Sequence, residues 1–194
     1  MKEPLLRNPD AYPDMDYLAT EAAQTRCVIA AWFVRDCPHV VEIGGFRTPI
    51  SLYLTGTHES VTVFDPLMRD HEAHSLNGAP CRVHHVSRPF QESAFEWAPR
   101  SYGLVMLGAS LKHFSEDAEE RERQWQKLAG VVERARVAVV EGALDWHLGR
   151  AALERLGSLG AMENRVCLDM DLRHNSDMDT EHHRRRLMVL APRM

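Results

Sequence analysis

Short apolar runs recur along the chain between glycine-containing polar stretches, which is the pattern of buried parallel strands alternating with helices. Runs rich in β-branched residues predict strands at 40–43, 61–64, 81–86, 102–108 and 137–140. Apolar residues at helical spacing, with their flanking caps, predict helices at 14–37, 50–56, 67–76, 115–130 and 145–156. The last two runs, 164–172 and 185–190, are joined by a polar connection and predict an antiparallel hairpin.

The segment 40–66 carries the most specific local pattern. Gly44 and Gly45 follow the first strand, and two adjacent glycines allow positive φ and a close approach of backbone to a ligand. Pro49 suits the first turn of a helix, and Asp65 ends the second strand about 20 residues after the glycines. This order of elements is typical of nucleotide-binding βαβ units, in which the acid holds ribose hydroxyls.

The same segment resembles the cofactor-binding half of class I S-adenosylmethionine (SAM) dependent methyltransferases. That family carries the run E/D-x-G-x-G-x-G. Glu42 and Gly44 match its acid and first glycine, whereas Phe46 and Thr48 stand at its second and third glycines. Taken over residues 14–191, the resemblance implies a single α/β domain, 1–194, with 1–37 as an N-terminal arm and helix. The implied fold is a three-layer, Rossmann-like doubly wound sheet of seven mostly parallel strands, with one antiparallel strand in the C-terminal hairpin.

The resemblance also assigns roles at the predicted strand ends, with SAM as cofactor. Asp65 would accept hydrogen bonds from the ribose diol, although a cap or turn role is the alternative. Glu42 and the Gly44 carbonyl would accept from the methionine amino group, and the backbone of 46–48, at a helix N-terminus, would donate to the carboxylate. The remaining expected contacts are Gly45, Phe46, Thr48, Pro66, Ser87 with Arg88 beside the adenine, and Leu107 at the strand end that faces the methyl group.

The methyl acceptor is poorly marked in the sequence. The Asn-Pro-Pro-Tyr run of similar nucleobase and glutamine methylators is missing after the fourth strand, and no cysteine pair indicates carbon methylation. His113 is the candidate catalytic base for an oxygen or nitrogen atom, because its ordinary pKa lies near neutrality. The alternative for His113 is a solvent-exposed residue at a helix start. We therefore expect a small-molecule acceptor activated by His113.

Charge and composition indicate which classes of binding partner the sequence favours. The 194 residues carry a net charge of −5 and a pI of about 6.1, which gives no overall basic field for nucleic acid. The basic run 184–186 is better explained as a solvated strand edge than as an RNA contact. His71 and His74 share one face of the predicted helix at 67–76, but two ligands are too few for zinc, so no metal is expected. A homodimer is compatible with the sequence.

Cysteine usage and hydropathy predict the compartment. Four separate cysteines without CxxC spacing indicate reduced thiols in a cytoplasmic protein: Cys27, Cys37, Cys81 and Cys167. The sequence contains no signal-peptide core and no apolar run of membrane-spanning length, so neither export nor membrane insertion is predicted.

Two other functions are compatible with the same residues. The loop Thr48-Pro49-Ile50-Ser51 is faintly similar to the Leu-Pro-Leu-Ser loop of nicotianamine-synthase-like proteins, which attack the aminopropyl carbons of SAM. S-adenosylhomocysteine as by-product would indicate methyl transfer, and methylthioadenosine would indicate aminobutyryl chemistry. The partial glycine run also fits a SAM-fold binding subunit without catalysis, which would show no SAM binding in calorimetry.

Overall fold

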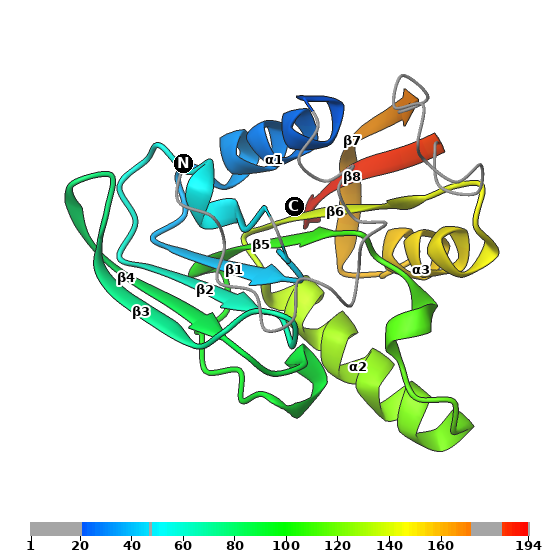
Figure 1. The fold of residues 1–194 in the computed structure, drawn as a ribbon. Coiled ribbons are helices and arrows are strands. Elements are labelled where there is room, and N and C mark those ends of the chain that lie inside the picture. The colour runs from blue at the N-terminus through cyan, green and yellow to red at the C-terminus, as the bar shows by residue number, and fades with distance from the viewer. Residues whose placement is uncertain (1–20, 47, 172–183, 194) are drawn as a thin grey trace.

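The computed structural model describes residues 21–46, 48–171 and 184–193, which form an α/β fold around one mixed sheet (Figure 1). The predicted arm at 1–13, the helix start at 14–20, Arg47 and most of the polar connection before the last strand lie outside the described residues. The strands are β1 (His39–Ile43), β2 (Ser60–Phe64), β3 (His71–Leu76), β4 (Ala79–Val86), β5 (Tyr102–Leu107), β6 (Val137–Ala143), β7 (Met162–Asp171) and β8 (Arg184–Pro192). The helices are α1 (Glu21–Val34), α2 (Ala118–Arg134) and α3 (His147–Gly157).

The strand order is β3-β4-β2-β1-β5-β6-β8-β7, so the sheet is doubly wound from β1 outward. Parallel pairing joins β4, β2, β1, β5 and β6, whereas β8 runs antiparallel between β6 and β7. The predicted fold class and its C-terminal antiparallel strand are therefore confirmed. The sheet has eight strands instead of the predicted seven, because β3 adds a further antiparallel edge strand beside β4.

Two apolar layers hold the helices on opposite faces of the sheet (Figure 1). Side chains of α1, such as Ala30 and Val34, pack with Val40 and Val105 on one face. On the other face, the buried side chains of α2 and α3 pack with alternate residues of the same strands: Trp125, Leu128, Leu153 and Leu156 against Val41, Leu104 and Val140. Both faces of the central strands are thus buried, which explains their nearly continuous apolar runs.

The segment 67–76 contradicts its predicted helix. Residues 71–76 form β3, which pairs antiparallel with β4 through a two-residue turn at Asn77 and Gly78. Both turn residues have positive φ, 51° and 83°, as hairpin turns of the Asn-Gly kind require. The spacing of His71 and His74 gave a helical pattern by coincidence, and the turn dipeptide was the better signal.

The helix expected after the glycine turn is also much shorter than predicted. Only one 3₁₀ turn, Ile50–Leu52, separates the turn from β2, and 3₁₀ turns at Phe90–Glu92 and Leu111–His113 follow β4 and β5. Asp117, and not Ser115 as predicted, caps α2, since its side chain accepts from the Glu120 N–H. Among the described residues, no helix combines the length and apolar character needed to cross a membrane.

The hairpin turn gives a first prediction. Gly78→Ala would place a Cβ where no other atom lies within 4 Å, so backbone strain at φ 83° is the only cost. We expect the free energy of unfolding to fall by about 1 kcal/mol in denaturant titration. Gly160→Ala is the control, because its added Cβ also meets open space and its φ is not positive. Equal losses in both variants would argue against a strained turn.

Candidate functional site at the carboxyl edge of the sheet

The glycine turn lies where β1 ends, at the carboxyl edge of the parallel strands. Gly44 and Gly45 have φ of 92° and 125°, and the Gly44 N–H donates to the Phe64 carbonyl at 2.9 Å, which ties the turn to β2. A Cβ on Gly45 would lie 2.8 Å from a Glu42 carboxylate oxygen and 2.9 Å from Val63 Cγ1. Position 45 therefore requires glycine for both its conformation and its close packing.

The Asp65 side chain links the segment after β1 to the segment after β2. Its Oδ2 accepts from the Phe46 N–H at 2.9 Å, and its Oδ1 accepts from the Leu67 N–H at 2.8 Å. Burial raises the pKa of Asp65, while these backbone donors and nearby His113 lower it. The acid thus lies at the predicted place and fixes the glycine turn, and its contact with ribose stays a prediction.

The backbone donors predicted for the SAM carboxylate are engaged within the loop. The Phe46 N–H is held by Asp65, and the Thr48 N–H donates to the Gly45 carbonyl at 2.8 Å. Phe46 is itself buried, and the 3₁₀ turn that follows offers no long helix N-terminus. The N–H groups of Phe46 and Thr48 are therefore engaged within the loop, Arg47 lies outside the described residues, and the anion contact of 46–48 stays a prediction.

Glu42 is fully buried, with 1% of its surface exposed, and its Oε2 accepts from the Ile50 N–H at 2.7 Å. Burial raises its pKa well above the usual range; the charge of Asp65 adds to this, while the Ile50 N–H and Arg26 oppose it. This environment favours the protonated form of the carboxyl. The predicted contact would require the cationic amino group of the methionine part of SAM to reach this buried carboxyl.

The remaining predicted cofactor residues lie along the same edge. Ser87 follows β4, where its N–H donates to Asp70 Oδ1 at 2.7 Å, while its buried hydroxyl has no hydrogen-bond partner among the described residues. Pro66 is exposed beside Asp65, and Leu107 is half-buried at the end of β5. A Cβ built on Gly44 would lie 3.8 Å from the Leu107 carbonyl oxygen, so the ends of β1 and β5 meet.

His113 lies in the 3₁₀ turn after β5, close enough to Asp65 for each to shift the other's pKa. Partial burial and the charge of Lys112 lower the pKa of His113, and Asp65 opposes both. The His113 carbonyl accepts from Gln91 Nε2 at 2.8 Å, which links this turn to the segment after β4. The structure thus brings His113 near Asp65 but leaves its side chain exposed, as the alternative for this residue expects, and its role as a base stays a prediction.

A buried charge cluster escaped the sequence analysis. Glu141, at the end of β6, has none of its surface exposed and pairs with Arg26 of α1 at 2.9 Å and with Arg185 of β8 through both oxygens. The two arginines lower its pKa against the effect of burial. A charged residue inside the otherwise apolar 26–34 stretch was the available signal. The cluster ties α1 and β8 to the centre of the sheet.

Comparison with solved structures identifies the fold as that of class I SAM-dependent methyltransferases. The N-methyltransferase NodS from Bradyrhizobium japonicum WM9 superposes with a TM-score of 0.64 at 11% identity, covering 97% of this chain and 94% of that protein. The 1,6-didemethyltoxoflavin-N1-methyltransferase of Burkholderia thailandensis gives 0.58 at 13% identity, covering 95% and 84%. An rRNA methylase from Streptococcus thermophilus gives 0.53 at 13% identity, covering 90% and 98%.

Comparisons by sequence add no relative. No family model matches the chain, and no curated protein matches it. The fold is therefore established by the structural likeness alone. The acids, glycines and histidine gathered at the carboxyl edge have to be judged by their own geometry.

The two fully buried glutamates should respond oppositely to amidation. Because burial raises the pKa of Glu42, the folded state holds its proton above pH 4.5, where the unfolded chain releases it, and stability falls as the pH rises. Glu42→Gln removes that loss, so its unfolding free energy relative to wild type should increase from pH 4 to pH 7. Glu141→Gln, which removes the counter-charge of Arg26 and Arg185, should instead lose about 3–5 kcal/mol at pH 7. Urea titrations at both pH values decide; a stability loss for Glu42→Gln that grows with pH would refute this assignment.

The coupling between Asp65 and His113 gives a third prediction, measured by NMR titration of the histidine ring. Asp65→Asn removes a charge that raises the pKa of His113, so this pKa should fall further below 6.5. Lys112→Gln removes a charge that lowers it, so the pKa should rise. Shifts of the same sign in the two variants, or no shift in either, would show that His113 is not coupled to Asp65.

Proposed function

We propose that this protein is a SAM-dependent methyltransferase that transfers a methyl group to an oxygen or nitrogen of a small-molecule acceptor. The observation that carries the proposal is the meeting of Glu42, the glycine turn, Asp65 and His113 at the carboxyl edge of this sheet. Open α/β sheets bind their ligands outside the carboxyl ends of the strands, beside the point where the strand order reverses. Here that point lies between β1 and β5, next to Gly44 and Leu107.

The residues at this edge fit the parts of SAM. A carboxylate offers about four acceptor positions, and Asp65 already receives backbone N–H groups of Phe46, Leu67 and Met68, so a position for a ribose hydroxyl is left. The unpartnered, buried hydroxyl of Ser87 is a donor and acceptor at the strand end assigned to the adenine. SAM supplies a sulfonium-bound methyl group that an oxygen or nitrogen can attack. Its positive charges would favour the ionised form of Glu42, whose pKa burial raises.

His113 supports the proton-handling role. Its lowered pKa keeps the imidazole neutral at pH 7, the form that accepts a proton from a hydroxyl or amine. The Gln91 contact and the serine cap of the turn, in which Ser110 Oγ accepts from the Lys112 N–H at 3.0 Å, fix the backbone that carries it. The names of NodS and the toxoflavin enzyme as N-methyltransferases support a nitrogen acceptor.

RNA methylation is the second candidate, because one structural neighbour is an rRNA methylase and another is the 23S rRNA methyltransferase ErmE. An acceptor screen by mass spectrometry with small amines, phenols, carboxylates and total RNA separates the two. The by-product tests the chemistry itself: S-adenosylhomocysteine supports methyl transfer, and methylthioadenosine would instead support the aminobutyryl alternative. Absence of any SAM or S-adenosylhomocysteine binding would favour a non-catalytic subunit.

A charge-only variant tests cofactor binding. Asp65→Asn keeps an acceptor for one backbone donor and removes the charge, so the affinity for S-adenosylhomocysteine should weaken by about 1–3 kcal/mol in calorimetry. Asp36→Asn is the control, since Asp36 is exposed before β1, at the other end of the strand, and the charge change is the same. Unchanged affinity in a folded Asp65→Asn protein would remove Asp65 from the site.

A further inference from the structure

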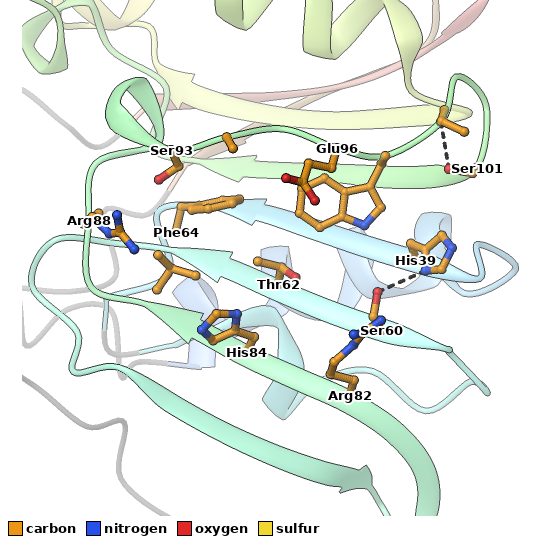
Figure 2. A pocket seen from close by; sticks show the side chains of 14 residues that line it. His39, Ser60, Thr62, Phe64, Arg82, His84, Arg88, Ser93, Glu96 and Ser101 are labelled. Atoms are coloured by element: carbon orange, nitrogen blue, oxygen red, sulfur yellow. Dashed lines mark hydrogen bonds between the residues drawn. The ribbon is translucent and has the colours of Figure 1, made fainter.

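A groove of about 610 Å³ crosses the sheet face of β1, β2 and β4 on the side away from α1 (Figure 2). Its floor is formed by side chains of these strands, and its wall is the extended segment from Ser93 to Ser101. Of the residues that the sequence analysis expects near the cofactor, only Arg88 lines it. The groove thus meets the carboxyl edge at one end and extends away from it over the sheet face, and its volume lies within the range of small-ligand sites.

The sequence encodes this face as polar near the starts of β2 and β4 and as apolar at their ends, where Phe64 and Val86 line the groove. In β4, Cys81 and Val83 are buried in the apolar layer beneath α1, whereas the alternate residues Arg82 and His84 line the groove. In β2, Val61 and Val63 face the same apolar layer, and Ser60 and Thr62 form the groove floor. Parallel strands covered on both faces carry apolar residues on both sides. The period-two alternation here instead builds a face suited to water or to a polar ligand.

Two guanidinium groups stand near opposite ends of the groove, as Figure 2 shows for Arg82 and Arg88. Five residues lie between them along the chain: Arg82 is in β4, whereas Arg88 follows the end of β4 at a turn in which its N–H donates to the Val86 carbonyl at 2.8 Å. Neither side chain has a hydrogen bond or ion pair within the part of the chain that the structure describes. Two cations that the fold itself leaves unneutralised at one groove indicate an anionic ligand.

Two histidines also line the groove, and both lie near other polar side chains. His39 lies 3.0 Å from the Ser60 hydroxyl and 3.9 Å from Glu59, and His84 lies 3.7 Å from Glu72. Glu96 is the single carboxylate among the lining residues. The lining thus combines free guanidiniums, several hydroxyls and one acid.

An aromatic platform completes the lining. Trp97 is half-buried and packs edge-on against Phe64, with ring centroids 6.3 Å apart and an interplanar angle of 89°. The Phe95 ring is tilted by 57° to the indole with centroids 4.7 Å apart, so other rings hold the indole in place. Aromatic rings can stack nucleobases, and such stacking is tolerant of the base.

We propose that this groove binds a nucleotide, with the base stacked on Trp97 and a phosphate paired with Arg82 or Arg88. Glu96 and the floor hydroxyls of Ser60 and Thr62 offer hydrogen bonds to the sugar and the base edge. A free nucleotide and a short single strand present the same chemistry, and the two arginines stand near opposite ends of the groove. A single strand engages both arginines, whereas a mononucleotide engages one.

The test uses the full chain and titrations by calorimetry and fluorescence anisotropy with UMP, AMP and a labelled hexauridylate. Arg82→Glu and Arg88→Glu should each weaken hexauridylate binding by at least about fivefold and reduce its salt dependence by a slope of about 0.7 per lost phosphate contact. For a mononucleotide, only one of the two variants should weaken binding. Arg121→Glu on α2 is the control, because it changes the net charge equally outside the groove.

Three outcomes would overturn the proposal. The first is no binding of any probe at about 1 mM, a concentration that detects even weak nucleotide sites. The second is an equal loss in Arg121→Glu, which would show a nonspecific charge effect. The third is displacement of the nucleotide by S-adenosylhomocysteine, which would place it in the cofactor site. A Trp97→Leu variant that melts like wild type, and yet binds no more weakly, would equally exclude stacking on this ring.

Discussion

The carboxyl edge of this protein depends on the hydrogen bonds of one buried carboxylate, that of Asp65. It receives the N–H of Phe46 from the turn after β1 and the N–H of Leu67 from the segment after β2. Hydrogen bonds to an ionised group are stronger than neutral ones, so this acid joins two neighbouring strand ends firmly. The Glu42 side chain makes a second link to this connection, because its Oε2 accepts from the N–H of Ile50. Two acids thus fix a glycine turn that only a single 3₁₀ turn follows.

The two fully buried glutamates, Glu141 and Glu42, differ in the charges that surround them. Glu141 receives two arginines and stays ionised, and it ties α1 and β8 to β6. Glu42 lies near Arg26 without forming such a pair, and burial dominates its titration. An isolated buried carboxyl is costly as an anion and is retained as a neutral acid or beside a cation. A carboxyl of this kind beside a glycine turn is consistent with a site that gains a positive ligand.

The sequence predicted the interior of the sheet better than its edge. Apolar runs such as 61–64 and 137–140 marked the central strands because both of their faces are buried, a signal that needs no tertiary information. The glycine turn and Asp65 were marked by their spacing, whereas His113 was chosen from the resemblance to methyltransferases and from its ordinary pKa. The closing of the loop on Asp65, and the Arg26–Glu141–Arg185 cluster, join residues up to 115 positions apart, and nothing local encodes such pairs. The segment 67–76 failed because its histidines imitate a helical face, while Asn77-Gly78 specified a hairpin.

The shortened connections have a physical consequence for the sheet face. A doubly wound sheet buries both faces only where crossover helices cover them, and on the face away from α1 the connection after β4 contains a single 3₁₀ turn. Polar side chains occupy the positions on this face where a covering helix would require apolar residues: Ser60, Thr62, Arg82 and His84. On the other side of the same two strands, Val61, Val63 and Val83 remain apolar because the layer beneath α1 covers them. The alternation shows that the open face is a property of the sequence, since a face awaiting a helix would be apolar. The same substitution of polar for apolar side chains that keeps this end of the sheet soluble also creates a groove with two free guanidiniums.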